Sequence, residues 1–344
     1  MTRTPTDHLT VTAHTSIDDC GAEWDTLMNA ADAPVFYRRP FLRAFEQHPL
    51  HPVRQTAYLL VRDHTGLAVA GLPAYLQQRV DPMRVLAGHL PQAVDTPVVF
   101  SHVWHCFDTV LPLHPQADDT AAHTLLSALR RQATAWDASL IGLANIDAAH
   151  PHTEILAQAG LHPVEIDTGW GLDLRAVPDF DTYLNGLGKA PRRNMRHDLR
   201  NAQDAGLTTS FHPPHEADLD GFVRLARATA AKYHNSDYYR PGLFQDFVRA
   251  LGNDVRVLEL RVDGHLVGSA LALVDPTRLH FWACGIDYDA CPGFSPFYIV
   301  FAELLREAIA NRRPWFEGGR RNPVFKSRYG LTPRTLTAWT TPIH

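Results

Sequence analysis

The stretch that decides the fold is Val255–Val274, VRVLELRVDGHLVGSALALV. Its two apolar, β-branched runs flank Asp263-Gly264, a dipeptide typical of a tight hairpin turn. A third strand is expected at Leu279–Gly285. After it, Pro296–Asn311 has helical periodicity with a proline at its start, where a helix tolerates one. A hairpin, a strand and a helix in this order predict a mixed sheet covered by helices.

The segments around this stretch extend the same plan. The sequence predicts further helices and strands at Asp181–Leu187, Arg192–Ala205, Leu207–His212, Asp218–Tyr233, Gly242–Leu251, Trp315–Glu317 and Leu336–Thr340. The first half shows a similar order of helix, hairpin, helix and strand, so a diverged duplication is plausible. With 344 residues, two domains are expected. We place them at residues 1–175 and 176–344, and the fold class is α/β with mixed sheets.

Charge is distributed unevenly along the chain. Residues 1–175 hold 11 basic and 19 acidic residues, a net charge of −8, whereas residues 176–344 hold 21 and 18, a net charge of +3. Basic groups concentrated in one half indicate that this half meets an anion. A simple drift of charge between two lobes explains the numbers equally well.

Several classes of protein are disfavoured. The N-terminus lacks the apolar core of a secretory signal, and no run of about 18 apolar residues exists, so we expect a cytoplasmic protein without a membrane span. The four cysteines form no CxxC pair, and the 20 histidines form no HExxH motif, so no metal site is expected. Cys284 and Cys291 are interpreted as buried structural thiols.

The first segment that can carry chemistry is the basic stretch Lys189–Ala202. Arg193, Arg196 and Arg200 are spaced so that a helix puts their guanidinium groups on one face. Together with Arg192 they form a surface that suits phosphate oxygens. The alternative is an ordinary solvated basic helix.

The second segment is the loop and helix start that follow the strand at Leu279–Gly285. Ser295 can cap this helix, and the first helical residues include Phe297 and Tyr298. Unpaired amides and the positive end of the helix dipole make such a position an anion site. We therefore expect Ser295, Phe297 and Tyr298 to contact the phosphates of a donor.

The third segment is Trp315–Gly330, in which a strand meets Gly318-Gly319 and a cluster of cations. Glycines let the backbone approach a ligand closely. A lysine held among arginines can stabilise negative charge that develops on a carbonyl oxygen. The lysine is Lys326, and the arginines, which we expect to hold donor phosphates, are Arg320, Arg321 and Arg328. The alternative is a charged surface loop.

Polar and aromatic residues in loops of both halves are candidates for binding an acceptor. They are Tyr37, Arg38, Asp95, Tyr238 and Tyr239. Clefts between domains are frequent ligand sites. We therefore expect the acceptor to lie between the two lobes.

These segments resemble the C-terminal domain of the Fem family and its relatives in the GNAT superfamily. The resemblance rests on Arg192–Gly206, on Gly293–Tyr298, and on Phe325, Lys326 and Gly330. It implies two tandem GNAT-like lobes, with the catalytic one at the C-terminus. Fem-type enzymes transfer an aminoacyl group from charged tRNA to an amine, and related proteins use acyl-CoA.

The resemblance also implies roles for individual residues. The lysine of the Phe-Lys pair, here Phe325-Lys326, stabilises the tetrahedral oxyanion in the family. The base that deprotonates the amine stays open between Asp287, Glu317 and the donor itself. The chain lacks the Gln/Arg-x-x-Gly-x-Gly/Ala loop that cradles the CoA pyrophosphate, and it also lacks the coiled-coil arm of some Fem members.

The leading hypothesis is an amide-forming transferase that uses aminoacyl-tRNA as co-substrate. Its acceptor would be an amine of a small molecule, a peptide or a cell-wall precursor. The alternatives are an acyl-CoA-dependent N-acyltransferase and a non-catalytic binding protein with a GNAT fold. No tightly bound cofactor and no DNA partner are expected.

Overall fold

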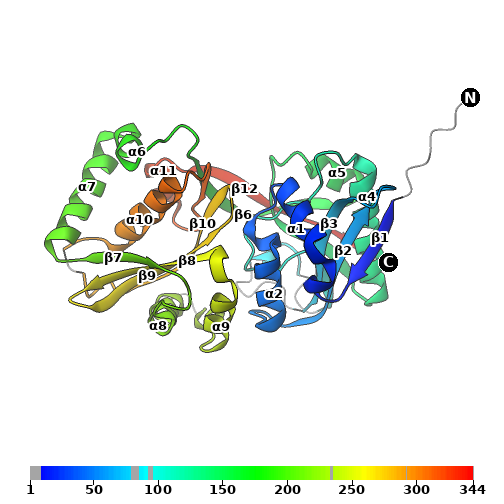
Figure 1. The fold of residues 1–344 in the computed structure, drawn as a ribbon, viewed down its shortest axis with the longest axis horizontal. Helices are drawn as coiled ribbons and strands as arrows, with labels where there is room; N and C mark the ends of the chain where they lie inside the picture. The colour runs from blue at the N-terminus through cyan, green and yellow to red at the C-terminus, as the bar shows by residue number, and fades with distance from the viewer. Residues whose placement is uncertain (1–8, 79–84, 92–95, 233–234, 292, 344) are drawn as a thin grey trace, which may run out of the picture. The chain divides into compact units, whose positions relative to one another are not determined.

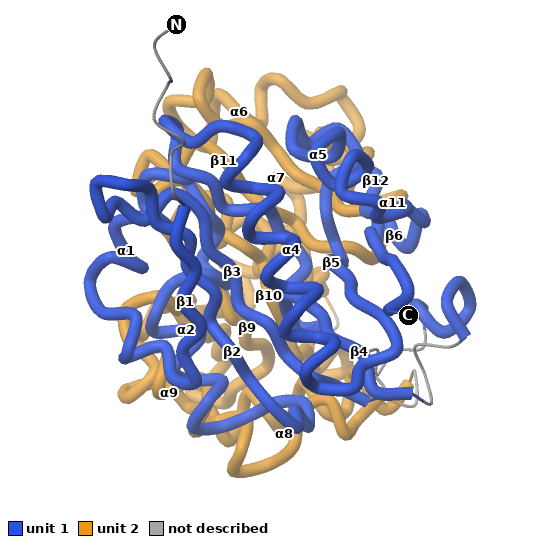
Figure 2. Tube along the Cα trace, turned by 90° about the vertical axis from the view of Figure 1, so that its right-hand side faces the viewer, with its two compact units in different colours: residues 1–167, 335–344 blue, residues 168–334 orange. Residues whose placement is uncertain are grey.

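The chain divides into two compact units, which Figure 2 shows in different colours. The computed structural model describes residues 9–78, 85–91, 96–232, 235–291 and 293–343. Unit 1 comprises residues 1–167 and 335–344, and unit 2 comprises residues 168–334. This division differs from the predicted boundary at residue 175 mainly because the end of the chain, residues 335–344, returns to unit 1. Its last strand, β12 (Thr332–Pro342), pairs antiparallel with β5 (Leu140–Asp147).

Unit 1 is a mixed sheet with the strand order β1-β2-β3-β4-β5-β12. Its other strands are β1 (Thr10–His14), β2 (Val53–Arg62), β3 (Ala68–Gln77) and β4 (Val98–Phe100). Its helices are α1 (Gly21–Ala30), α2 (Arg39–Gln47), α4 (Asp119–Ala135) and α5 (Thr153–Gln158).

Both faces of the unit 1 sheet are buried. On one face, Leu59 packs in the same core as Leu125 and Leu129 of α4. On the other, Tyr58 meets Trp24 of α1, with ring centroids 5.7 Å apart. Successive strand residues point to opposite faces, so a strand covered on both sides reads as the continuous apolar run seen in β2 and β3.

The strands of unit 2 are also mixed in direction and have the order β6-β11-β10-β9-β8-β7. Its strands are β6 (His162–Asp173), β7 (Thr208–His212), β8 (Val255–Val262), β9 (His265–Val274), β10 (Arg278–Ile286) and β11 (Trp315–Glu317). Its helices are α6 (Phe180–Gly186), α7 (Lys189–Asp204), α8 (Leu219–Ala231), α9 (Leu243–Ala250), α10 (Pro296–Ala310) and α11 (Pro323–Arg328).

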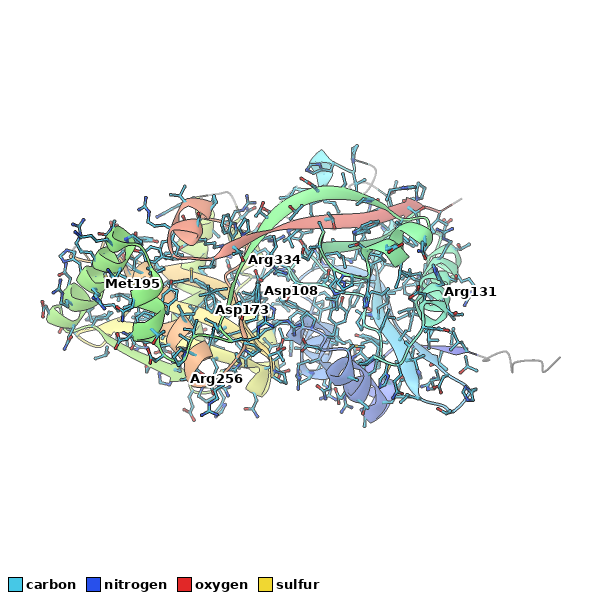
Figure 3. All side chains as sticks on the ribbon, turned by 90° about the horizontal axis from the view of Figure 1, so that it is seen from above. Asp108, Arg131, Asp173, Met195, Arg256 and Arg334 are labelled. Atoms are coloured by element: carbon cyan, nitrogen blue, oxygen red, sulfur yellow. The ribbon has the colours of Figure 1, made fainter. Side chains whose placement is uncertain are left out.

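Helices cover both faces of the unit 2 sheet as well. Figure 1 shows α7 and α10 on one face and α8 and α9 on the other. The approach of α8 depends on Gly285 of β10, because a Cβ there would lie 2.3 Å from the amide nitrogen of Ala226. Met195 of α7, labelled in Figure 3, is fully buried in the core on the other face.

The two units share one topology, which confirms the repeated plan at the level of strand pairing. In each, an antiparallel run of strands ends at a strand that pairs in parallel with the next one along the sheet: β4 with β5, and β10 with β11. A long helix, α4 or α10, connects the members of each parallel pair. Among the helices that the structure describes, none is both long enough and apolar enough to cross a membrane.

Candidate active site

The candidate site of unit 2 lies where β10 and β11 stop pairing and diverge. They pair in parallel through Arg278–His280 and Trp315–Glu317, and β10 then continues to Ile286 while β11 ends. The pairing of β10 with β9 shifts register between Phe281 and Ala283. Such bulges change the direction of side chains and are frequent next to active sites.

The double glycine that follows β11 is held against the neighbouring strands. The amide of Gly318 donates to the carbonyl of Trp170 (2.7 Å), and the amide of Trp170 donates to the carbonyl of Gly319 (3.1 Å). A Cβ on Gly318 would lie 2.4 Å from Leu331, and Gly319 has φ +74°. Only glycine fits both positions, so the backbone here is tightly fixed.

Lys326 sits on the short helix α11, where the sequence pattern predicts a loop. Asn322, with φ +63°, and Pro323 start the helix. At its end the amide of Leu331 donates to the carbonyl of Lys326 (3.0 Å), and Gly330 takes the left-handed conformation that closes many helices. The side chain of Lys326 is 6% exposed. Its position is therefore fixed by a helix with a defined start and end.

Lys326 faces β10. Burial raises the pKa of the Cys284 thiol to about 12, and the nearby charge of Lys326 opposes this shift. The thiol is thus protonated at neutral pH, which agrees with a structural thiol and not with a nucleophile. The charge of Lys326 thus lies near Cys284 in the divergent part of β10.

Phe325 is buried, and its assignment as a catalytic residue stays a prediction. It is buried in an aromatic cluster with Phe297 (centroids 4.9 Å apart), Tyr298 (5.1 Å), Phe301 (5.1 Å) and Tyr329 (4.5 Å). The rings of Phe297 and Tyr298, predicted to contact the donor, take part in this packing. The cluster anchors α11 on α10 and so sets the position of Lys326.

Glu317, a candidate base, is fully buried and already paired. Its carboxylate accepts from Arg334, from Trp315 Nε1 (3.3 Å) and from the amide of Gly319 (3.2 Å). Arg334, labelled in Figure 3, also lies over the Trp315 ring, 5.5 Å from its centroid. Glu317 therefore holds the glycine loop through the amide of Gly319. Its role as a base stays a prediction.

Asp287, the other candidate base, follows β10. Its Oδ1 accepts from the amides of Asp289 (3.1 Å) and Ala290 (3.3 Å), so it closes the turn that leads toward α10. The side chain is half-buried. Its role as a base stays a prediction.

The basic face predicted on α7 is present. Arg193, Arg196 and Arg200 are exposed, while Met195 and Ala202 on the opposite face are buried. The carbonyl of Asn185 accepts from Arg192 (3.2 Å), and its side chain accepts from Arg196 (3.1 Å). That this face binds donor phosphates stays a prediction.

The remaining donor-side arginines surround α11. Arg321 and Arg328 are exposed, and Arg320 is half-buried. All three lie within nine residues of Gly319 in sequence, close to Lys326 along the chain. Their contact with a donor stays a prediction.

The start of α10 is occupied from within the chain, which corrects the expectation of free amides at Ser295 and Tyr298. The amide of Ser295 donates to Asp198 of α7 (2.7 Å). The amide of Tyr298 donates to the carbonyl of Ser295 (3.0 Å). Sequence reasoning missed Asp198, although an acidic residue inside an arginine-rich helix was a signal that could have been followed.

The predicted acceptor residues are spread over both units. Tyr37 is fully buried in unit 1, where its hydroxyl donates to the carbonyl of Val110 and accepts from its amide. This core position corrects its assignment as a loop residue open to an acceptor. Arg38 is half-buried and donates to Asn29 (3.4 Å). Asp95 lies outside the described residues.

The acceptor candidates of unit 2, Tyr238 and Tyr239, lie at the short turn between α8 and α9. Arg227 donates to the carbonyl of Tyr239 (3.2 Å) and fixes the turn that carries Tyr238 and Tyr239. Burial is the main cause that raises the pKa of Tyr239, and Tyr238 and Cys284 contribute. Their contact with an acceptor stays a prediction.

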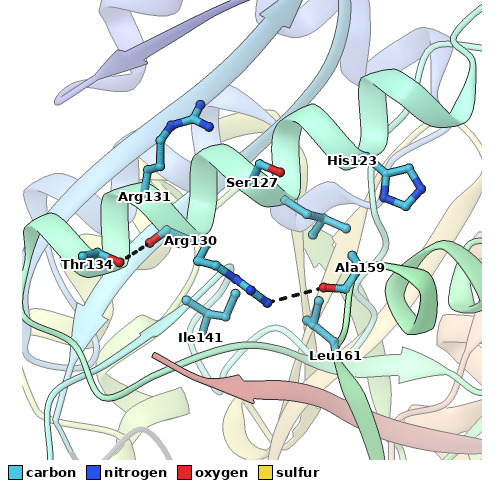
Figure 4. Close-up of a pocket in the computed structure, with 9 residues that line it drawn as sticks. His123, Ser127, Arg130, Arg131, Thr134, Ile141, Ala159 and Leu161 are labelled. Carbon is cyan, nitrogen blue, oxygen red and sulfur yellow. Dashed lines mark hydrogen bonds between the residues drawn. The ribbon is translucent and has the colours of Figure 1, made fainter. Parts of the chain in front are cut away.

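A pocket of about 470 Å³ opens elsewhere, on α4 of unit 1. Figure 4 shows Arg130 extending across it to the carbonyl of Ala159 (3.4 Å), while Arg131 points away. Ile141 and Leu161 line its wall. It lacks the buried cation of the unit 2 site, and no sequence motif marks it.

Comparison with known proteins agrees with this architecture. Residues 189–327 match the family model of the acetyltransferase (GNAT) domain. No curated protein matches the sequence.

Solved structures match over nearly the whole chain at low identity. FemX is similar with a TM-score of 0.66 and 10% identity, over 96% of this chain and 96% of that one. A tandem GNAT protein from the clavulanic acid biosynthesis pathway, solved without AcCoA, has a TM-score of 0.58 and 15% identity, over 98% and 99%. The C-terminal domain of a putative lysylphosphatidylglycerol synthetase from Agrobacterium fabrum has 0.58 and 12%, over 92% of both chains. Residues 189–327 of unit 2 are therefore similar to the acetyltransferase (GNAT) domain, and the chain as a whole has a fold similar to the folds of these three proteins.

Proposed function

We propose that the protein is an amide-forming acyltransferase that moves an aminoacyl group from aminoacyl-tRNA to an amine. The acceptor amine would belong to a small molecule, a peptide or a cell-wall precursor. The single observation that carries the proposal is the buried Lys326, fixed on α11 beside the divergent part of β10. The resemblance to Fem-type transferases supports the choice of donor.

The chemistry of the proposed step explains why a buried cation is needed. The amine attacks the ester carbonyl of the donor, and negative charge develops on the carbonyl oxygen. The attack forms the C–N bond; collapse of this intermediate then breaks the C–O bond, and the proton that the amine loses passes to the released hydroxyl of the tRNA. A lysine held in a mostly water-excluded site stabilises the oxyanion more than it stabilises the neutral ester.

Two features support a nucleic-acid donor. The exposed arginines of α7 offer forked donors to phosphates, and residues 176–344 carry a net charge of +3. The start of α10, where an acyl-CoA pyrophosphate would bind, is taken by Asp198.

A second candidate, transfer from acyl-CoA, is favoured by one observation. The similar tandem GNAT protein is described with reference to AcCoA. Transfer from charged tRNA, transfer from acyl-CoA and binding without transfer are three different results, and one purified protein can distinguish them.

The test supplies the protein with tRNA charged with radiolabelled amino acids, or with radiolabelled acetyl-CoA, together with a panel of amines. We expect label to pass from charged tRNA into an amide that resists mild base, which hydrolyses the ester. Label transferred from acetyl-CoA alone would establish the second candidate. Binding of one donor or of both, with no transfer from either, would show that the fold serves binding and not catalysis.

A further inference from the structure

We propose that Asp198 is a donor-selectivity residue: its carboxylate fills the anion position at the start of α10 and keeps pyrophosphate-bearing donors such as acyl-CoA out of unit 2. The inference rests on the proposed acyltransferase function. It goes further by assigning the choice of donor to one side chain of α7.

The start of α10 carries the positive end of a helix dipole. The helix has 15 residues, Ser295 precedes it and Pro296 is its first residue. Amides at such an end are unpaired by the helix itself, and the helix dipole is positive there. In this chain a carboxylate meets that charge, because Asp198 Oδ1 accepts from the amide of Ser295 at 2.7 Å.

A second contact from α7 holds the carboxylate in place. Asn201 Nδ2 donates to the carbonyl of Gly293, also at 2.7 Å. Asp198 and Asn201 are three residues apart and share one face of the helix. The two bonds attach α7 to both the loop and the first amide of α10, so a ligand phosphate would have to displace a tethered group.

The carboxylate of Asp198 lies near the aromatic rings at the start of α10. The charge of Asp198 contributes to raising the pKa of Tyr329, whose ring packs on Tyr298 with centroids 5.4 Å apart. The hydroxyl of Tyr329 donates to the carbonyl of Pro191 at the first turn of α7 (3.4 Å). The rings of Tyr298 and Tyr329 and the first turn of α7 thus lie beside the start of α10, and a pyrophosphate there would meet the carboxylate at close range.

The arginines of α7 lie on a different part of the helix. Arg193, Arg196 and Arg200 are exposed, whereas Asp198 is half-buried. One helix therefore presents cations outward and a carboxylate toward α10. A donor with many spaced phosphates can use the outer face, but a donor that needs the helix start cannot bind there.

The test measures binding of free CoA by calorimetry to the wild-type protein, Asp198→Ala and Asp198→Asn. The matched control is Asp204→Asn, which removes an exposed carboxylate from the same helix. We expect weak or no binding by the wild type and the control, and affinity gained by roughly tenfold or more in both Asp198 variants, the scale on which a charge within about 4–6 Å shifts an ionic equilibrium. Thermal unfolding is followed for each variant, and Asp198→Asn, which keeps the shape of the side chain, decides if Asp198→Ala does not fold.

Two results would overturn the proposal. One is micromolar binding of CoA by the wild type. The other is folded Asp198 variants with unchanged CoA binding, in which case the carboxylate only attaches α7 to α10. Transfer from charged tRNA by the wild type is measured separately. Its failure would reject the proposed donor while a gain of CoA binding still supported the role of Asp198.

Discussion

Lys326 is the residue on which the proposed chemistry depends. Replacing it by Met keeps most of the buried volume but removes the positive charge. We expect kcat to fall by roughly 10²–10³, the effect of losing one oxyanion donor, with little change in the Michaelis constant for the donor. Steady-state kinetics with charged tRNA would measure both constants. Lys232→Met, which makes the same change at an exposed lysine, is the matched control and should keep most of kcat.

A different outcome would change the assignment of this lysine. If Lys326→Met kept normal turnover and only raised the Michaelis constant, Lys326 would bind the donor. The oxyanion role would then be rejected.

Cys284 offers a chemical probe of the same site. Its raised pKa of about 12 means that the thiol is protonated below that pH, so its reactivity should increase about tenfold per pH unit between pH 7 and pH 10. At pH 8 we expect alkylation to be roughly 10²–10³-fold slower than that of an exposed cysteine with an ordinary pKa. Peptide mapping by mass spectrometry after timed iodoacetamide treatment would measure the rate.

The neighbouring lysine gives this measurement an internal check. Because the charge of Lys326 lowers the pKa of Cys284, Lys326→Met should make the thiol slower still. Faster alkylation in that variant would mean that the lysine mainly shields the thiol sterically from the reagent.

At the scale of single residues, the sequence pointed to a residue type that is rare in the chain. It could not predict roles that depend on partners far away in the sequence. Lys326 was recognisable because the chain has only three lysines. The role of Glu317 was not, since its main partner, Arg334, follows 17 residues later. Tyr37 was taken for a loop residue because nothing in its local pattern shows that Val110 satisfies its hydroxyl.

The helix α7 can be tested as a binding element. Arg193→Ala with Arg196→Ala should weaken donor binding and reduce its salt slope by about two, one for each phosphate that is no longer neutralised. The fold should be unaffected, since both side chains are exposed. Donor binding at several salt concentrations would measure the slope. Arg224→Ala with Arg249→Ala is the control, because it removes the same charge from exposed sites on α8 and α9. It should leave the salt slope nearly unchanged. An equal decrease of the slope in both double variants would show a general charge effect.

The strand β11 depends on a buried ion pair. Arg334→Met would leave the fully buried carboxylate of Glu317 without its cation, which is expected to destabilise the protein by about 3–5 kcal/mol. Urea unfolding would measure the change. Adding Glu317→Gln should restore part of the stability, whereas Arg249→Met, which breaks the exposed pair with Asp246, should change it by less than about 1 kcal/mol. No difference between the buried and exposed pairs would contradict the assignment.

Elements with a strong local pattern were predicted closely. The strand Val255–Val262 and the short strand Trp315–Glu317 have the predicted bounds. The helix α11 was missed because it has only six residues, too few to show a period. Its start at Asn322-Pro323 and its end at Gly330 were the local signals that could have revealed it.

At the scale of the whole molecule, unit 1 should depend on the end of the chain. Leu336, Ala338 and Trp339 of β12 are buried in the cores of unit 1. A chain ending at Arg334 would lack these side chains and uncover one edge of β5. We expect faster hydrogen exchange throughout β5 and its neighbours in unit 1, with β8 and β9 of unit 2 still protected. Exchange measured by mass spectrometry would test this, and full protection of β5 in the shortened chain would contradict it.

The boundary between the units was beyond the reach of sequence patterns. Pairing of β5 with β12 joins residues near 141 to residues near 341, and no local composition records a contact over that distance. The strand itself was predicted at Leu336–Thr340, but not which sheet it joins. Hydrophobic periodicity indicates that a strand is buried, and only the tertiary structure decides its neighbour.

The return of β12 to unit 1 has a consequence for how the protein is made. Ribosomes produce the N-terminus first, at about 5–20 residues per second. After β5 leaves the ribosome, all of residues 168–334 must be made before the strand that covers its edge, which takes roughly 10–30 s at that speed. Throughout this interval the nascent chain exposes an unpaired strand edge, a template for wrong pairing. The first unit to be synthesised is thus the last to be completed, and a prematurely terminated chain would keep that edge exposed.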